Sequence, residues 1–341
     1  MRLPNWVGDV LLATPFLRAL RRGYPDAKLT VHGKGHTLEL VADEGLWDRA
    51  LPLEKPGKLW PVREGQRVRR EAGPFDLALI LPNSFSSAVV ARLVGARERV
   101  GYGLNGRSPL LTRALPVQKV GRLRPIPMVD YYLAMLEALG IDTAGIPRRP
   151  QLTVTPEQAA RAAELRRAAG IAPDARVWAL NFGGAWKTKR WVPHQGGQLI
   201  QLLRGEGIVP YLLWGPGEEE LRDEVVAAAG GEPVPGADTL IPLDGLTAFL
   251  QGVELMVSTD SGPRHFGVAA GTPVIVLVGG THPDYTHVDY DRYRILCAEV
   301  ECWPCHLKTC PIDFRCMRLL TPAYVLQSGL SLLGELSDHP G

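Results

Sequence analysis

The stretch Leu255-Met256-Val257-Ser258-Thr259-Asp260-Ser261-Gly262-Pro263-Arg264-His265 decides the fold class of this chain. Its first four residues form an apolar run typical of a buried strand. The helical pattern of residues 263–270 begins at a proline, which is favoured in a first helical turn. A second apolar run follows at residues 274–278. Strand, loop, helix and strand in this order are typical of a doubly wound parallel sheet.

The same alternation runs through both halves of the chain, so the sequence predicts an α/β protein. Expected strands lie at residues 28–32, 75–81, 177–181, 209–214, 255–258 and 274–278. Expected helices lie at residues 10–22, 36–43, 63–72, 85–94, 127–139, 156–169, 194–204, 218–229, 245–251 and 263–270.

The length of 341 residues predicts more than one domain, because single cores stop growing at roughly 250–300 residues. Prolines at residues 146–151 favour a boundary there. We therefore expect two Rossmann-like domains, at residues 1–150 and 151–321, whose sheets face a central cleft. A C-terminal helix and tail would occupy residues 322–341.

Composition places the chain among ordinary globular proteins, with 45% hydrophobic and 22% charged residues. No run of about 18 apolar residues and no secretory signal is present, which predicts a cytoplasmic protein. Residues 1–150 hold 23 Lys and Arg against 14 Asp and Glu, a net charge of +9, whereas the remainder carries −7. The basic half indicates either an anionic partner or an arginine-rich solvated surface.

Near the N-terminus, Asn5-Trp6-Val7-Gly8-Asp9 is expected to form a loop before the first helix. At the end of a parallel strand, Asp9 would lie where ligands bind, although it can also be an N-cap. Only residues 1–3 remain for the preceding strand, shorter than the usual 5–6 residues. We expect either an upstream start codon or a first strand reduced to these residues.

Three later loops carry candidate ligand-binding groups. Backbone N–H groups near Ser261 and Gly262 can receive a phosphate at a helix start, although Asp260 or Ser261 can equally be an N-cap and His265 a packed histidine. Residues 181–191 end a strand in small residues and then lysines, without the spacing of a P-loop. The three glutamates at 218–220 suit either ribose hydroxyls or the dipole of the helix that they open.

Together these loops resemble the ordered signatures of the lipopolysaccharide heptosyltransferases, glycosyltransferase family 9, of the heptosyltransferase II type. The signatures are Asn5-Trp6-Val7-Gly8-Asp9, Leu81-Pro82-Asn83-Ser84-Phe85-Ser86-Ser87-Ala88, Lys189-Arg190-Trp191-Val192-Pro193 and Thr259-Asp260-Ser261-Gly262-Pro263-Arg264-His265. The resemblance covers nearly the whole chain. It implies the GT-B arrangement, with the acceptor bound by the first domain and the nucleotide sugar by the second.

The resemblance also implies a reaction, the inverting transfer of heptose from ADP-L-glycero-β-D-manno-heptose to a Kdo-containing lipid A core. Asp9 matches the family's base, and Lys189 would stabilise the departing diphosphate. The implied nucleotide-sugar ligands are Gly184, Ala185, Glu219, Asp260, Ser261, Gly262 and His265. The implied acceptor ligands are Asn83, Ser84, Arg63, Arg67 and Arg70. No cofactor is required for catalysis, and peripheral contact with the inner membrane is expected.

Three other function classes compete with the transferase. A catalytically inactive sugar-nucleotide-binding protein of the same fold remains the alternative, because the first strand is short. A nicotinamide-dependent oxidoreductase is disfavoured, because no Gly-x-Gly-x-x-Gly follows a strand with an acidic residue about 20 residues later. A nucleic-acid binder is disfavoured too, because no recognisable module is present.

Four cysteines, Cys302, Cys305, Cys310 and Cys316, lie within fifteen residues with C-x2-C-x4-C-x5-C spacing, and Cys297 precedes them. The expected segment is an insert at residues 297–316. In a reducing compartment such clustering favours a structural Zn or Fe ion over disulfides. Oxidised pairs and free thiols remain open, because the paired C-x2-C spacing of strong metal motifs is absent.

Overall fold

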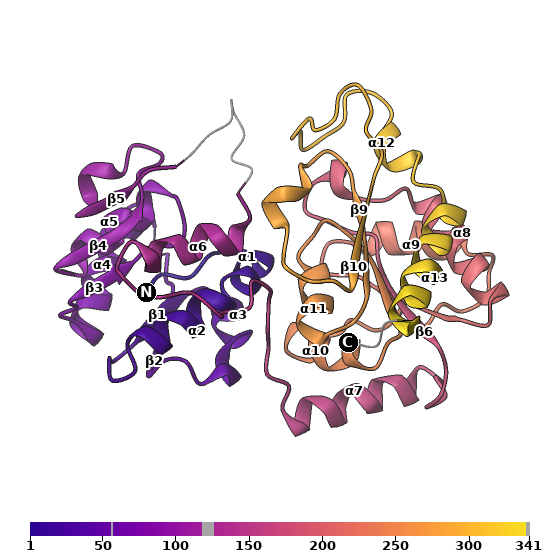
Figure 1. Ribbon diagram of the computed structural model, residues 1–341, viewed down its shortest axis with the longest axis horizontal. Coiled ribbons are helices and arrows are strands. Elements are labelled where there is room, and N and C mark those ends of the chain that lie inside the picture. Colours follow the sequence, from indigo (N-terminus) through magenta and orange to yellow (C-terminus); the bar gives the residue numbers. More distant parts are fainter. Residues whose placement is uncertain (56, 118–125, 339–341) are drawn as a thin grey trace. The chain divides into compact units, whose positions relative to one another are not determined.

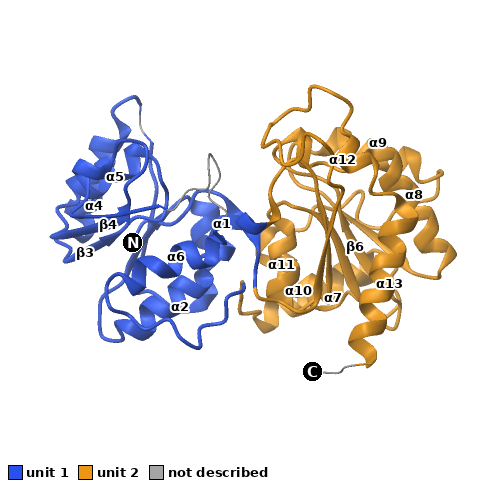
Figure 2. Cartoon of the chain, turned by 45° about the horizontal axis from the view of Figure 1, so that its top comes forward, with its two compact units in different colours: residues 1–149, 284–288 blue, residues 150–283, 289–341 orange. Residues whose placement is uncertain are grey.

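The computed structural model describes residues 1–55, 57–117 and 126–338 of the chain, which divides into two compact units (Figures 1 and 2). Unit 1 comprises Met1–Arg149 and Asp284–Val288, and unit 2 comprises Pro150–Pro283 and Asp289–Gly341. Each unit is an α/β layer structure built on parallel strands, as the sequence predicts.

The sheet of unit 1 is assembled around residues 1–3. On one side lie β1 (Thr30–Gly33) and β2 (Arg49–Pro52), and on the other lie β3 (Leu77–Leu79), β4 (Glu98–Tyr102) and β5 (Arg113–Leu115). Arg2 bridges in parallel to both His32 and Ile80. The strand order is therefore β2, β1, residues 1–3, β3, β4, β5, which is the Rossmann order 3-2-1-4-5-6.

The helices of unit 1 cover both faces of this sheet. They are α1 (Val7–Leu12), α2 (Thr14–Gly23), α3 (Gly35–Glu39), α4 (Trp60–Ala72), α5 (Phe85–Leu93) and α6 (Met128–Glu137), with short turns η1 (Ala42–Glu44) and η2 (Ser108–Leu110). Helices α4 and α5 pack together, as do α2 and α6 (Figure 2). The prediction of one helix at residues 10–22 preceded by a loop was wrong. Helix α1 begins at Val7 and a break at Ala13 separates it from α2, so Asp9 lies in a first helical turn.

Unit 2 has a five-stranded parallel sheet in the order β7, β6, β8, β9, β10. The strands are β6 (Val177–Asn181), β7 (Val209–Leu213), β8 (Leu255–Thr259), β9 (Val274–Val278) and β10 (Tyr293–Cys297). Every residue of β6, β8 and β9 is buried, which explains their continuous apolar sequences. The strand order reverses between β6 and β8.

Helices enclose this second sheet as well: α7 (Pro156–Ala168), α8 (Pro193–Gly205), α9 (Glu219–Ala228), α10 (Leu243–Gln251), α11 (Pro263–Ala270), α12 (Arg315–Arg318) and α13 (Pro322–Asp338), with the short turn η3 (Lys187–Lys189). The short turn η4 (Pro283–Thr286) belongs to unit 1 from Asp284 on. The C-terminal helix α13 packs on α8 and on the sheet. Gly329 makes this approach possible, because a Cβ there would lie 2.3 Å from the ring of Trp178. Helix α13 is thus part of the core of unit 2.

Candidate active site

In open α/β sheets, ligands bind at the carboxyl ends of the strands where the strand order reverses. In unit 1 this point lies between residues 1–3 and β3, and the segments that leave it carry Asp9 on one side and Asn83 and Ser84 on the other. In unit 2 it lies between β6 and β8, whose following loops carry Gly184 and Asp260. Asp9, Asn83, Ser84, Gly184 and Asp260 therefore lie at the switch point of one sheet or the other. Arg63, Arg67 and Arg70 lie instead on α4, which follows β2, and Glu219 follows β7.

Asp9 is half-buried in the first turn of α1. The positive end of the helix favours its ionised carboxylate. Burial raises the pKa of the Tyr132 phenol well above 10, and the negative charge of Asp9 adds to that shift. The Asp9 carboxylate thus acts electrostatically on α6.

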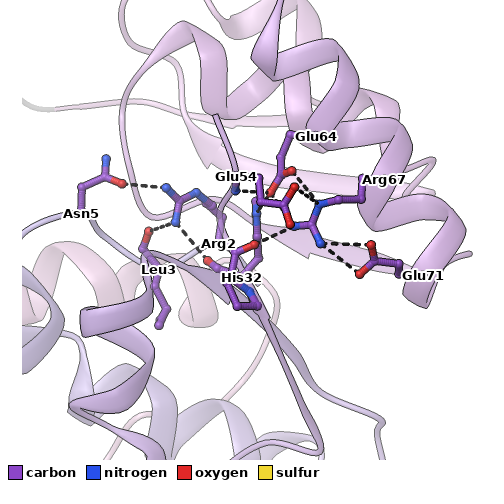
Figure 3. A network of polar contacts seen from close by, with 9 residues as sticks. Arg2, Leu3, Asn5, His32, Glu54, Glu64, Arg67 and Glu71 are labelled. Carbon is purple, nitrogen blue, oxygen red and sulfur yellow. Dashed lines mark hydrogen bonds and ion pairs between the residues drawn. The ribbon is translucent and has the colours of Figure 1, made fainter. Parts of the chain in front are cut away.

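A polar network links the segment before α1 to β1 and α4 (Figure 3). The Arg2 guanidinium donates to the carbonyl oxygens of Leu3 and His32 and to Asn5 Oδ1, the last at 2.6 Å. His32 Nε2 lies 2.7 Å from Glu64 Oε1. Burial, and then the charge of Arg2, lower the pKa of His32 to about 4, so this imidazole is neutral at pH 7. Arg2 therefore fixes the Asn5 side chain through a hydrogen bond, while its bonds to two backbone carbonyl oxygens fix Arg2 itself.

The predicted acceptor arginines of α4 differ in their surroundings. Arg67 forms ion pairs with Glu54, Glu64 and Glu71, the two shortest at 2.8 Å and 3.0 Å (Figure 3). Its charge is thus balanced inside unit 1. Arg63 and Arg70 are exposed on the same helix, and their role as acceptor ligands stays a prediction.

Asn83 and Ser84 follow β3 and lead into α5. Ser84 is the N-cap of α5, where its Oγ accepts the N–H of Ser87 at 3.2 Å. Asn83 is half-buried, and its Oδ1 accepts hydrogen bonds from Arg107 and Tyr131. Sequence analysis missed Arg107 and Tyr131, because neither belongs to a motif and both contacts join distant segments.

Lys189 and Asp260 form an ion pair in unit 2 whose carboxylate is buried. Lys189 Nζ donates to the Asp260 carbonyl oxygen at 2.8 Å and lies 3.2 Å from Asp260 Oδ2. Thr281 Oγ1 donates to Oδ2 at 2.8 Å, and Arg264 Nε lies 3.5 Å from Oδ1. The Asp260 side chain is 3% exposed and that of Lys189 20%. Asp260 therefore fixes an ammonium group that still reaches solvent.

Side-chain hydrogen bonds of hydroxyl groups fix the loop between β8 and α11. Ser261 Oγ donates to Asn181 Oδ1 at 3.1 Å and contacts Thr259 Oγ1 at 3.0 Å. Gly262 is the N-cap of α11 and provides no side-chain cap. The N–H of Ser261 already donates to the Thr259 carbonyl oxygen at 2.7 Å, so the N–H of Gly262, and not that of Ser261, can receive an anion at this helix start.

His265 lies one turn into α11 and is buried. Burial, and then the charge of Arg264, hold its pKa well below the usual range, so the ring is neutral. Its Nδ1 has no hydrogen-bond partner within the part of the chain that the structure describes. A neutral ring nitrogen of this kind can serve as an acceptor or a donor for a ligand.

Glu218, which sequence analysis did not single out, joins the glycine loop to α9. Its Oε1 accepts the N–H of Gly184 at 2.8 Å, and its Oε2 accepts the N–H of Gly215 at 3.0 Å. Glu219, the predicted ribose ligand, is exposed and accepts the N–H of Gly217 at 3.1 Å. Ala185 is exposed beside this loop. The run of three glutamates indicated a functional carboxylate here, but the sequence alone does not say which of the three accepts the N–H groups of the glycine loop.

The cysteine-rich segment packs directly behind Lys189. The backbone N–H of Thr188 donates to the Lys308 carbonyl oxygen at 3.4 Å, and Thr188 Oγ1 donates to that of Leu307. All five cysteines are free thiols. Among the residues that the structure describes, no three His, Cys, Asp or Glu side chains converge in a way that would hold a metal ion.

Comparison with known proteins decides the family. The family model described as glycosyltransferase family 9 (heptosyltransferase) matches residues 62–314. The chain belongs to glycosyltransferase family 9. Lipopolysaccharide heptosyltransferase 2 of Escherichia coli is similar to it, with 28% identity over 312 residues that cover 86% of each chain.

Solved structures show the same fold as this family 9 chain. A family 9 glycosyl transferase from Veillonella parvula matches with a TM-score of 0.83 at 21% identity, covering 98% of this chain and 96% of that one. The E. coli ADP-heptose lps heptosyltransferase II matches with a TM-score of 0.77 at 23% identity, covering 98% of both chains. The predicted GT-B fold class, with two Rossmann-like units, is confirmed.

Proposed function

We propose that this family 9 protein is an inverting heptosyltransferase that uses ADP-heptose as donor and a lipopolysaccharide inner-core sugar as acceptor. The carrying observation is the Lys189 ammonium, fixed by buried Asp260 at the switch point of the unit 2 sheet. Its relatives support the substrate class, since their names include ADP-heptose and lipopolysaccharide.

The donor half of the reaction rests on unit 2. Lys189 would bind the diphosphate and stabilise the charge that develops when the bond between the anomeric carbon and the diphosphate oxygen breaks. The N–H groups at the start of α11 would bind the same group, with Ser261 and His265 nearby. Gly184, Ala185 and Glu219 would contact the nucleoside. Lysine and helix N-terminus together supply the charge stabilisation that the leaving group needs.

The acceptor half rests on unit 1. Asp9 would take the proton of the acceptor hydroxyl as its oxygen bonds to the anomeric carbon, while the bonding pair leaves with ADP. Attack opposite the leaving group inverts the configuration. A base of this kind contributes typically 10²–10⁴-fold to rate. Asn83, Ser84, Arg63 and Arg70 would bind the acceptor, and the ion pairs of Arg67 with three glutamates give it a supporting role on α4.

The acceptor proposal includes contact with a membrane surface, because the implied acceptor is lipid-linked. The net charge of +9 on residues 1–150 favours anionic lipid and phosphorylated sugar. None of the helices in the described ranges is long and apolar enough to cross a bilayer. We therefore propose peripheral association at the cytoplasmic face.

We further propose that the cysteine-rich segment can take up a structural zinc or iron ion. Burial raises the pKa of the Cys316 thiol, and the nearby Cys305, Cys302 and Cys310 raise it further. These four thiols would have to turn toward one centre to become a ligand set. Elemental analysis of anaerobically purified protein and of Cys310→Ser tests this, and a metal-free wild type would end the proposal.

The transferase assignment is tested by substituting Asp9 with asparagine. We expect ADP release that depends on the core acceptor to fall by about 10²–10⁴-fold, with ADP affinity within twofold of wild type. Product mass would show one added heptose only for the wild type. Equal turnover by Asp9→Asn would contradict the base assignment. A wild type that binds ADP-heptose but transfers nothing would favour the inactive sugar-nucleotide-binding alternative.

A further inference from the structure

Asn83 is held in one orientation by two buried donors. Its Oδ1 accepts from Arg107 Nη2 at 3.0 Å and from the Tyr131 hydroxyl at 3.1 Å. Arg107 is 0% and Tyr131 5% exposed. A carboxamide oxygen has two lone pairs, and a guanidinium can only donate, so the atom that faces Arg107 must be the oxygen. The amide nitrogen is therefore directed away from both partners.

The Nδ2 group of Asn83 has no hydrogen-bond partner among the described residues, although the side chain is half-buried at the carboxyl edge of the sheet. The backbone around it is fixed too. The carbonyl oxygen of Asn83 accepts from Asn105 Nδ2 at 2.8 Å, and that of Pro82 accepts from Arg107. The two N–H bonds of the Asn83 side-chain amide therefore point in a fixed direction.

Arg107 is a buried cation with neutral partners only. Its Nε donates to the Tyr102 carbonyl oxygen at 2.7 Å, and Ser87 Oγ lies 3.4 Å from Nη1. Gly101 makes room for it, because a Cβ there would lie 3.2 Å from Nη2. No carboxylate pairs with Arg107 in the ranges that the structure describes. An unbalanced positive charge under this edge attracts an anion and polarises the Asn83 amide toward donation.

Tyr131 is held by its own packing. Its ring stacks on that of Tyr102 with centroids 3.8 Å apart and an interplanar angle of 17°. The Tyr102 hydroxyl donates to the Tyr131 carbonyl oxygen at 2.5 Å. Removal of the Tyr131 hydroxyl alone should therefore leave the ring in place.

We propose that Arg107 and Tyr131 are positioning residues that lock the Asn83 amide so that its Nδ2 donates to an anionic oxygen, a carboxylate or phosphate of the acceptor. This inference rests on the proposed function for the identity of the acceptor. It deepens that proposal, because it assigns the donating atom, the chemical class that the atom recognises and the two residues that orient it.

The central test is Asn83→Asp, which keeps both accepted hydrogen bonds and removes the donor. Arg107 would then face a carboxylate, so the melting temperature should be unchanged or higher. The probe is a deacylated, phosphorylated Kdo-heptose core oligosaccharide, with binding measured by calorimetry. We expect its Kd to rise about tenfold or more, as is typical when a hydrogen bond to a charged group is lost. The Kd for ADP should stay within twofold.

Two further variants separate orientation from charge and from folding. Tyr131→Phe adds no charge and frees one lone pair of Asn83 Oδ1, and it should weaken core binding about threefold or more. Phe85→Asp places the same new charge two residues away, on an exposed side chain in the first turn of α5, and should weaken core binding less than Asn83→Asp does. A Kd for Asn83→Asp equal to that of wild type, or equal losses in both Asp variants, would overturn the inference.

Binding is measured without turnover, so the two proposals fail separately. One outcome would support the inference and refute the transferase: the wild type binds the core, Asn83→Asp does not bind it, and the wild type transfers no heptose. The opposite outcome would support the transferase and refute the inference: the wild type transfers heptose, and Asn83→Asp binds the core as tightly as the wild type does. A wild type that does not bind the anionic core overturns the inference outright.

Discussion

Lys189 is the residue on which leaving-group stabilisation depends in the proposed reaction. Substitution by methionine keeps the length of the side chain and removes the ammonium group. We expect kcat to fall by about 10²–10³-fold, as when other preorganised transition-state contacts are removed. Asp260 would keep Thr281 and Arg264, so the fold should survive. Steady-state ADP release and thermal unfolding measure the two effects.

The matched control for that variant is Lys187→Met, because Lys187 is an exposed lysine of the same η3 turn. Its turnover should stay within about twofold of wild type. Near-normal turnover by Lys189→Met would remove Lys189 from the mechanism.

Glu218 positions the glycine loop rather than touching the reacting atoms. Glu218→Gln loses one of the two carboxylate oxygens that accept the N–H groups of Gly184 and Gly215. We expect the KM for ADP-heptose to rise about threefold to tenfold with little change in kcat, since a hydrogen bond contributes about 1 kcal/mol. Glu220→Gln, at an exposed position of the same helix, is the control. A fall in kcat at constant KM would argue against a positioning role.

Sequence placed the chemistry-bearing residues well where a strand runs into a loop. Lys189, Asp260 and Asn83 were all named, and the structure puts each at a sheet switch point. It named Glu218 only as one of three glutamates and did not name Arg107, because their partners lie 34 and 24 residues away and only the folded chain brings them together. Whether the named side chains act as predicted is decided by the variants above.

At the scale of elements, predictions were most accurate for the central strands of unit 2 and missed four strands of the two sheets. Strands β6 and β9 and helix α11 have the bounds that the sequence predicts. Strands β2, β4, β5 and β10 were missed. Strands β2 and β5 are three or four residues long and mostly exposed, and β4 and β10 each have an arginine that interrupts their apolar residues. Helical periodicity also carried no signal for the break between α1 and α2 at Ala13.

The buried contact between β1 and α4 makes stability depend on pH. The folded pKa of His32, about 4, lies below the unfolded value near 6.5, so the unfolded state binds more protons as pH falls through this range. This group should lower the free energy of unfolding by about 2 kcal/mol between pH 7 and pH 5. His32→Gln retains a donor for Glu64 and should show a smaller loss. Chemical denaturation at both pH values measures it, and equal losses would contradict the assignment.

At the scale of the whole molecule, the charge division should appear as a difference in salt dependence. Residues 1–150 carry a net charge of +9, whereas the donor side has a few local cations in a net negative half. Raising KCl from about 50 to 500 mM shortens the screening length from about 14 to about 4 Å. We expect the KM for the anionic core to rise more steeply than that for ADP-heptose. Equal salt dependence of both constants would show that the basic surface is not used for the acceptor.

The three-residue centre of the unit 1 sheet has a consequence for cooperativity. Residues 1–3 join β1 to β3 through a few hydrogen bonds, among them Arg2 N–H to Leu79 at 2.8 Å and Leu3 N–H to His32 at 2.9 Å, whereas β6, β8 and β9 pair along most of their length. Because only a few hydrogen bonds must break to separate β1 from β3, the free energy of this local opening should be low. Amide protons of β1 and β3 should therefore exchange with deuterium well before those of β8. The sheet of unit 1, whose central residues lead into the helix that carries Asp9, would open before the sheet of unit 2.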